Sequence, residues 1–245
     1  MQNTEFRTGV IKPVECVKEA WEMIKSDYWI LFAITILGAM LGGVSLYVLI
    51  GAMICGIYRA YFRKMDGFAV SIDDLWKGFE YLKPSALATV VVVVPAVIWI
   101  VVLISTIYVP IIVAAMMKTK INGDALFGIF VGVFGIDLVV AVVMVCFHTL
   151  MMFVFPLIVD RQLSSWQAIR ISARAVMKNL SGVTGLFVVN FVIALAGEMV
   201  FCVGIYLAIP IIFATNAVAF RKVFPRLDDQ RFDPPPPSVY SEGLV

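Results

Sequence analysis

The chain has 245 residues, of which 62% are hydrophobic and 15% are charged, and its formal net charge is +2. A soluble domain is typically about half apolar with about 25% charged residues, so this composition excludes an ordinary soluble fold. The few polar side chains cannot cover so much apolar surface, and hydrocarbon must therefore be the solvent for most of the chain. We expect an all-α integral membrane protein.

Six stretches approach the roughly 20 apolar residues that a membrane-spanning helix needs. Short breaks join them in pairs, most clearly at residues 42–45, where the chain reads Gly-Gly-Val-Ser. Six transmembrane helices in three hairpins are therefore predicted. The spans lie at residues 29–44, 46–61, 86 to about 109, 129 to about 157, 183–198 and 201–220.

A short amphipathic helix is predicted before each hairpin, at residues 13–25, at residues 71–83 and from Ser164 onward. Pro13 suits the first turn of a helix, and Ser164 with Gln167 has the spacing of a capping box. Such half-apolar helices lie flat in the membrane interface. Each segment also has a small residue followed five residues later by a lysine, which indicates a threefold internal repeat. The pairs are Ala20 and Lys25, Gly78 and Lys83, and Ala173 and Lys178.

The basic residues give the predicted orientation. Of 19 lysines and arginines, only Lys118 and Lys120 fall on the far side of the predicted spans. Basic residues accumulate on the cytoplasmic side of a membrane, so both termini and all three amphipathic helices are expected in the cytoplasm. The start of the chain lacks the pattern of a cleaved signal peptide. We divide the chain into a cytoplasmic N-terminal segment, 1–27, a six-span membrane domain, 28–222, and an extended proline-rich cytoplasmic tail, 223–245.

Polar side chains within the predicted spans are candidates for an in-membrane site, because lipid solvates such groups poorly. The candidates are Asp137, His148, Asn190 and Asn216. Asp137 is either a proton or cation site, or a carboxylate at the interface or paired with Lys118 or Lys120. His148 follows eleven residues later on the same helix face, about 16 Å away. It either shares a polar pathway with Asp137 or packs as a hydrogen-bonded histidine.

A basic stripe is predicted on the third amphipathic helix, where Arg170, Arg174 and Lys178 are spaced by four residues. Each cation contributes about 1 kcal/mol of attraction to an anionic membrane leaflet. The stripe either recognises lipid head groups or serves as ordinary anchoring on the cytoplasmic side. Its position indicates membrane lipid as the partner and argues against nucleic acid.

Two glycine pairs have the GxxxG spacing that lets membrane helices approach closely. They are Gly38 with Gly42 and Gly128 with Gly132. The spacing is compatible with packing inside one chain and with contact between two chains.

Catalytic motifs are absent from the sequence, which lacks a nucleophile elbow, a phosphate loop, HExxH and a dinucleotide fingerprint. A single histidine excludes a site with several histidine ligands, and the four cysteines are scattered without any CxxC pair. We therefore expect no enzyme activity, no cofactor and no bound metal.

A recognisable pattern begins at Phe155 with FPLIVDRQLSSWQAIRISARAVMKN and continues after the next span with GIYLAIPIIFATNAVAFRKVF. It resembles a bacterial six-helix integral membrane family related to the membrane domain of glycerophosphodiester phosphodiesterases. WKGFEYLKPSA, after the second span, extends the resemblance. Pro156, Asp160, Pro210 and Arg221 match in what look like structural roles. The catalytic barrel is absent, so the resemblance implies the bacterial inner membrane but no hydrolase activity.

Two functions are compatible with these features. The sequence favours a non-catalytic accessory or scaffold subunit of a larger membrane complex, because interaction surfaces are many and chemistry is scarce. The alternative is a transporter or channel for a small molecule or ion that uses the polar residues within the spans. A transport site requires those residues to converge, which their scattered positions in the sequence do not indicate.

Overall fold

A computed structural model describes residues 6–45, 48–116, 123–199 and 204–226. Within these ranges every regular element is a helix. Four of the described helices are long and apolar enough to cross a membrane, or five if the bent pair α1 and α2 makes one span. These apolar helices indicate a multi-pass membrane protein. Lys118, Lys120 and all but the first residues of the predicted tail lie outside the described residues.

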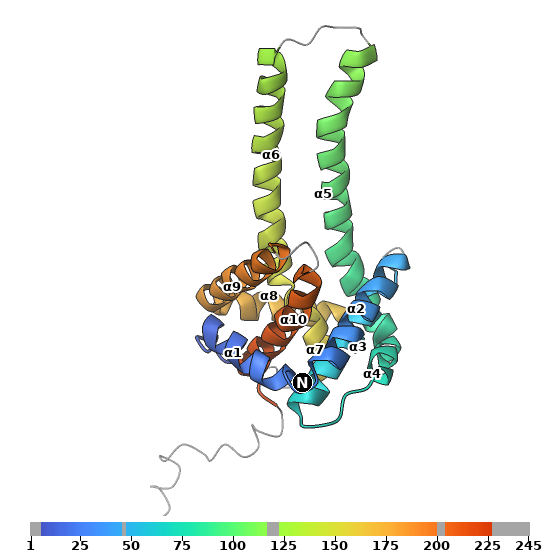
Figure 1. Cartoon of the computed structure of the whole chain (residues 1–245), viewed down its shortest axis with the longest axis vertical. Helices are drawn as coiled ribbons and strands as arrows, with labels where there is room; N and C mark the ends of the chain where they lie inside the picture. Colours follow the sequence, from blue (N-terminus) through green and yellow to red (C-terminus); the bar gives the residue numbers. More distant parts are fainter. Residues whose placement is uncertain (1–5, 46–47, 117–122, 200–203, 227–245) are drawn as a thin grey trace, which may run out of the picture.

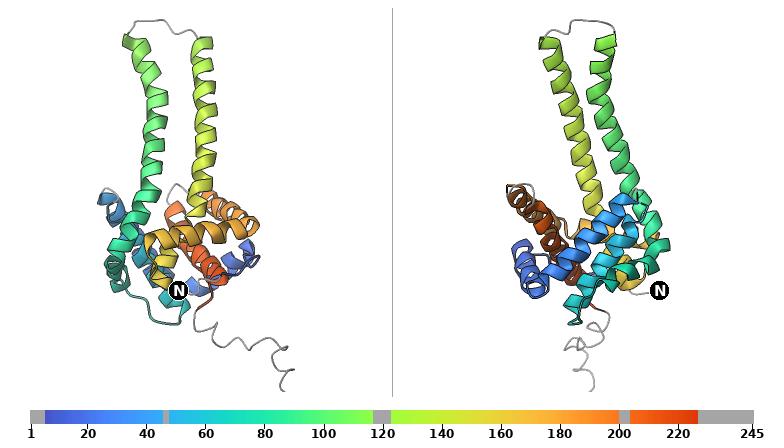
Figure 2. Two further views of the ribbon diagram at one scale, coloured as in Figure 1. Left: turned by 180° about the vertical axis from the view of Figure 1, so that it is seen from behind. Right: turned by 45° about the vertical axis from the view of Figure 1, so that its right-hand side comes forward.

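The molecule consists of a compact body and a long helical hairpin that projects from it (Figure 1). The hairpin is made by α5 (Leu82–Met116) and α6 (Gly123–Leu150), which lie side by side in every view (Figure 2). The other helices form the body: α1 (Pro13–Ile24), α2 (Tyr28–Val44), α3 (Ile50–Met65), α4 (Asp73–Trp76), the short 3₁₀ helix η1 (Lys77–Tyr81), α7 (Val154–Arg161), α8 (Ser165–Lys178), α9 (Leu180–Glu198) and α10 (Gly204–Val223).

The break predicted at residues 42–45 ends α2. The Ser45 hydroxyl donates to the Gly42 carbonyl at 2.9 Å and accepts the Leu49 N–H at 3.1 Å, so it satisfies backbone groups on both sides of the break. α3 then returns along α2 but has only 16 residues and carries Arg63 and Lys64 in its last turn. It is consequently absent from the four described helices that meet the criteria for a span.

The second predicted amphipathic helix forms α4 and η1, which continue directly into α5. It packs tightly beneath α3, because Gly56 of α3 approaches the backbone of Leu75 and Gly78 of η1 approaches the backbone of Ala52. A side chain at either glycine would collide with main-chain atoms. The Ser71 N–H donates to the Asp74 carboxylate at 3.1 Å.

The third predicted amphipathic helix is confirmed as α8. The Ser164 N–H donates to the side chain of Gln167 at 3.3 Å, which is one half of a capping box. Before α8, the predicted fourth span is interrupted, since α6 ends at Leu150 and the chain turns before α7. Ser172 of α8 holds this turn, donating to the Leu150 carbonyl at 2.7 Å and accepting the Phe153 N–H at 3.1 Å.

The core of the body gathers segments far apart in the sequence. Phe153, Phe220 and Phe224 pack together with ring centroids 5.1–6.0 Å apart, and only the Phe220–Phe224 pair is stacked. α1 packs against α9 and α10, and the chain before α1 is tied to their ends. There the Arg7 N–H donates to the Val223 carbonyl at 2.8 Å, and the Gly9 N–H donates to the Asn179 side chain at 2.7 Å.

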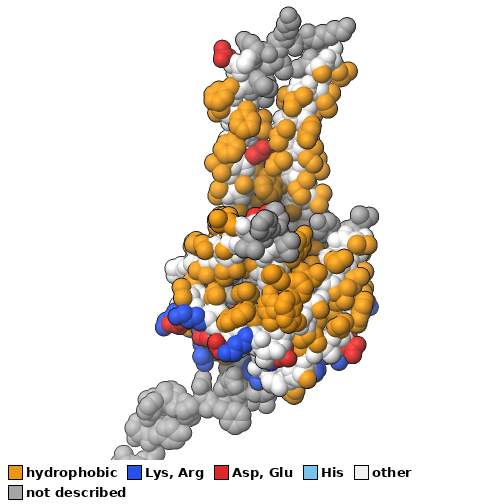
Figure 3. Space-filling model, viewed as in Figure 1, with side chains coloured by type: hydrophobic (Ala, Val, Ile, Leu, Met, Phe, Trp, Pro, Cys, Tyr) orange, Lys and Arg blue, Asp and Glu red, His pale blue; other side chains and the backbone are white. Residues whose placement is uncertain are grey.

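Charged side chains gather at the end of the body that lies away from the hairpin (Figure 3). A network of ion pairs organises part of this base: Arg221 pairs with Asp160 and lies 3.8 Å from Asp66, and Arg161 pairs with Asp160 at 3.1 Å. The Arg221 guanidinium also lies 4.6 Å from the centre of the Phe62 ring. Among the described residues, charged side chains are therefore concentrated at this base, while α6 of the hairpin carries only Asp124 and Asp137.

Candidate functional site

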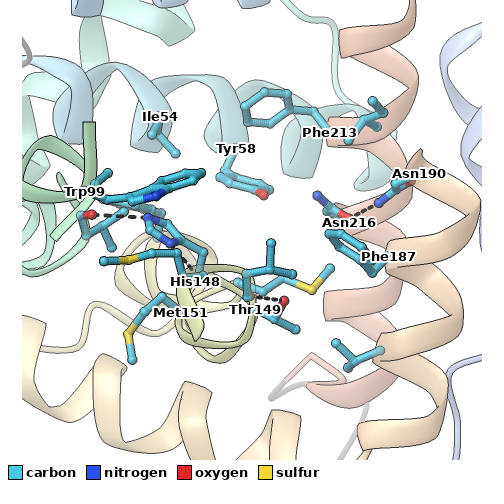
Figure 4. Close-up of a pocket in the computed structure, with 18 residues that line it drawn as sticks. Ile54, Tyr58, Trp99, His148, Thr149, Met151, Phe187, Asn190, Phe213 and Asn216 are labelled. Carbon is cyan, nitrogen blue, oxygen red and sulfur yellow. Dashed lines mark hydrogen bonds between the residues drawn. The ribbon is translucent and has the colours of Figure 1, made fainter. Parts of the chain in front are cut away.

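A pocket of about 570 Å³ lies where α5 and α6 enter the body and meet α3, α9 and α10 (Figure 4). Three of the four polar residues predicted for an in-membrane site line it, each from a different helix. These residues are His148 of α6, Asn190 of α9 and Asn216 of α10. The fold thus brings together side chains that the sequence places far apart.

His148 connects the two helices of the hairpin at the pocket. Its Nδ1 atom lies 2.8 Å from the carbonyl oxygen of Met144, and its Nε2 atom lies 3.2 Å from the carbonyl oxygen of Val92 in α5. A neutral imidazole carries one N–H and donates to only one of these oxygens, whereas the protonated ring donates to both. His148 thus lies within hydrogen-bonding distance of backbone carbonyls in both helices, and the ring also forms part of the pocket wall.

Asn190 and Asn216 form the second polar group of the pocket. The Asn190 Nδ2 atom donates to the Asn216 Oδ1 atom at 2.9 Å and so links α9 to α10. The Asn216 side chain also interacts with the hydroxyl group of Tyr58 from α3. Hydrogen bonds between amides are typical contacts of membrane helices, where water is not available as a partner.

Two polar atoms at the pocket lack partners among the described residues. They are Nε1 of Trp99, a donor, and Oδ1 of Asn190, an acceptor. Both atoms are buried, and both residues line the pocket. A buried polar group without a partner costs about 1–3 kcal/mol, so each would gain from a ligand that supplied the missing partner.

The remaining wall is apolar. Methionine and phenylalanine side chains make up half of it and aliphatic side chains the other half, and no lining residue is Asp, Glu, Lys or Arg. Methionine is flexible and polarizable, which suits a surface that adapts to different hydrophobic ligands. The apolar lining residues are Ile54, Val92, Ala96, Met144, Val145, Met151, Met152, Phe155, Val183, Phe187, Ile212 and Phe213.

Asp137, the fourth predicted polar residue, does not join this pocket. It lies farther along α6, and its Oδ1 atom is buried without a partner among the described residues. The predicted pairing with Lys118 or Lys120 lies outside the described residues. Asp137 and His148 both lie on α6. The polar pathway predicted to include both residues stays a prediction.

The basic stripe is exposed on the surface of α8. Arg170, Arg174 and Lys178 all face outward, while the opposite face of the helix is buried against the body. The Arg170 guanidinium lies 4.8 Å from the centre of the Trp166 ring. This arrangement leaves the three cations accessible, and their contact with lipid head groups stays a prediction.

Trp99 and Tyr58 are pocket residues that the sequence analysis missed. Both lie within apolar runs, where an aromatic side chain at the lipid surface has the same local pattern. One feature of the sequence could have identified them: each side chain carries one hydrogen-bonding atom in a segment predicted to cross the membrane.

The described cysteines offer no chemistry at the pocket. Cys16 and Cys55 are buried and free, and burial raises the pKa of the Cys16 thiol. Cys146 is exposed on α6, and Cys202 lies outside the described residues. Within the described ranges, no group of three or more potential metal ligands occurs.

Comparison with protein-family models, with curated proteins and with solved structures finds no match to this chain. The resemblance to the bacterial six-helix family therefore stays a prediction.

Proposed function

We propose that this protein binds a small hydrophobic or amphiphilic molecule within the membrane and transfers it without covalent chemistry, as a carrier or transporter does. The supporting observation is the convergence of His148, Asn190 and Asn216 on one pocket whose other walls are mostly apolar. Ligand sites commonly combine apolar walls with a few placed polar groups, and their volumes are roughly 300–1,000 Å³. The pocket, at about 570 Å³, falls in that range.

The proposal is tested by filling the pocket. Ala96 lines it, whereas Val97 is the next residue of α5 and is 46% exposed, so Ala96→Trp and Val97→Trp add similar bulk on different sides of one helix. Each form is purified in a mild detergent, and the small molecules that it retains are extracted and identified by mass spectrometry. The wild type and Val97→Trp should retain the same compound, which Ala96→Trp should lose about tenfold, as expected for about 1.4 kcal/mol of lost binding. Equal retention by all three would contradict the proposal.

A second function, that of an accessory subunit, is favoured by the length of the hairpin. α5 has 35 residues and would extend about 52 Å, whereas the hydrocarbon core of a bilayer is about 30 Å thick. Tilting relieves part of such a mismatch, and contact with another membrane protein is a further way to cover the excess. Isolation from native membranes followed by a native gel tests this function. Stoichiometric co-migration with other proteins supports it, and migration as a monomer speaks against it.

The finer topology belongs to the same proposal. We place the termini and the amphipathic helices in the cytoplasm of a bacterium, with six passes through the inner membrane arranged as a threefold repeat. The charged base and the exposed stripe of Arg170, Arg174 and Lys178 support an anionic cytoplasmic leaflet as the lipid partner. Cysteine labelling from either side of sealed vesicles at the two termini and at the hairpin tip tests this orientation.

A further inference from the structure

The pocket contains no carboxylate, lysine or arginine that would compensate a charged ligand, and both ring nitrogens of His148 already face backbone carbonyls. Its polar residues are Tyr58, Trp99, His148, Thr149, Asn190 and Asn216, and none of the lining residues is a carboxylate, a lysine or an arginine. Transfer of an unpaired ionised group into an apolar environment costs far more than transfer of a hydroxyl or an amide. The head group of a molecule that enters this pocket should therefore be neutral.

The unpaired atoms specify which hydrogen bonds that head group should make. Among the described residues, Trp99 Nε1 lacks an acceptor and Asn190 Oδ1 lacks a donor. Figure 4 shows Trp99 and Asn190 on opposite sides of the pocket, with Tyr58 between them. A ligand that satisfies both must carry an acceptor and a separate donor, as an ester carbonyl next to hydroxyl groups provides.

The rest of the wall fits a flexible chain. Met144, Met151 and Met152 contribute adaptable side chains, and Phe187 and Phe213 contribute aromatic surface. From the neutral polar groups, the unpaired donor and acceptor, and this wall, we infer that the pocket binds a neutral single-chain lipid whose head group both donates and accepts hydrogen bonds, such as a monoacylglycerol. The inference rests on the proposed function and adds the chemical class of the ligand.

Trp99 supplies a fluorescent reporter for the test, because bromine atoms on a lipid chain quench the fluorescence of a nearby indole ring. In a variant that keeps only Trp99, with Trp21→Phe, Trp29→Phe, Trp76→Phe and Trp166→Phe, quenching is titrated with three brominated probes. Dibromostearoyl glycerol offers donors and acceptors, methyl dibromostearate offers acceptors only, and dibromostearate at alkaline pH is charged. A control uses the wild-type protein, without the four substitutions. Unbrominated forms of the same lipids compete with the ligand that the protein retains, and they should displace it in the same order of affinity.

The glycerol ester should bind most tightly. The methyl ester should bind about fivefold more weakly, as one lost hydrogen bond predicts, and the ionised acid should bind at least about tenfold more weakly. Asn190→Leu should remove the advantage of the glycerol ester over the methyl ester, whereas Thr184→Val, at an exposed position of the same helix outside the pocket, should preserve it.

The other outcomes distinguish failure of the head-group inference from failure of the proposed function. Equal affinity for both esters, or tighter binding of the ionised acid, would overturn the inference about the head group while leaving a binding pocket in place. Absence of saturable quenching by any probe, together with no competition in the wild type, would overturn the proposed function itself.

Discussion

The body and the α5–α6 hairpin are both rich in apolar residues but bury them to different extents. Half of the most apolar stretch of α10, in the body, is buried, whereas none of the corresponding stretch of α6 is; α9, at the edge of the body, is 11% buried over its own stretch. The hairpin exposes branched and aromatic side chains such as Val97, Phe130 and Phe134 along its length. Hydrophobicity therefore specifies lipid as the solvent of the hairpin, and the body uses the same property to build a protein core.

Glycine spacing shows the same difference. Gly38 approaches the side chains of Ile57 and Leu75 within the body, so its spacing is explained by packing inside the chain. Gly128 and Gly132 of α6 each leave room for a methyl group, with no atom of the described residues within 4 Å of the place it would occupy. Packing inside the described part of the chain therefore does not explain the spacing of Gly128 and Gly132. In a membrane, lipid or another protein would cover this face of α6.

The largest expected effect is a loss of stability when a charged side chain is removed from the body, compared with removal of one from the hairpin. Arg221 and Asp160 are each 13% exposed, and Arg221→Leu leaves Asp160 and Asp66 with one fewer cationic partner. Breaking a largely buried ion pair costs about 3 kcal/mol, so the thermal midpoint measured by size-exclusion chromatography of heated, detergent-solubilised protein should fall sharply. Asp137→Asn, in the hairpin, should not lower the midpoint. A larger loss for Asp137→Asn than for Arg221→Leu would reverse the comparison.

A glycine pair should give the next largest effect. Gly56→Ala forces a methyl group into the backbone of Leu75 and should destabilise the body by about 2 kcal/mol, in the range of overpacked cores. Gly132→Ala meets no described neighbour and improves helix propensity, so it should leave stability unchanged or higher. The same heating assay ranks the two variants. Destabilisation by Gly132→Ala would indicate a close helix partner for the hairpin.

The smallest expected effect concerns the corner between α1 and α2, outside the apolar stretches. A hydrogen bond from Lys64 holds the pKa of Asp27 below its ordinary value of 3.8. A lowered pKa in the folded state means that this contact stabilises at neutral pH and that the stabilisation disappears as pH falls through that lowered value. Because the Asp27 side chain is 42% exposed, solvent screening limits the contribution to roughly 0.5 kcal/mol.

This effect is measured as the difference in thermal midpoint between wild type and Asp27→Asn at a series of pH values. The wild type should be slightly more stable at neutral pH, and the difference should vanish at acidic pH. A difference that does not change with pH would show that the carboxylate charge is not its origin.

The sequence predicted the helical membrane class, the breaks between α2 and α3 and between α9 and α10, and the cap of α8, because each depends on local composition. It also identified His148, Asn190 and Asn216 as polar groups in apolar surroundings. Their convergence depends on how the helices around the pocket pack against one another, and the spacing of residues along the sequence does not specify that packing. Trp99 was missed because an indole facing lipid and one lining a pocket have the same sequence context.

The proposed ligand site of the pocket is tested most directly by photo-crosslinking at two positions of α9. Benzoylphenylalanine replaces either Phe187, which lines the pocket, or Phe191, which lies one turn away and is 58% exposed. After irradiation in native membranes, mass spectrometry should find one predominant small-molecule adduct at position 187 and the mixture of bulk membrane lipids at position 191. The same bulk mixture at both positions would contradict a selective binding site.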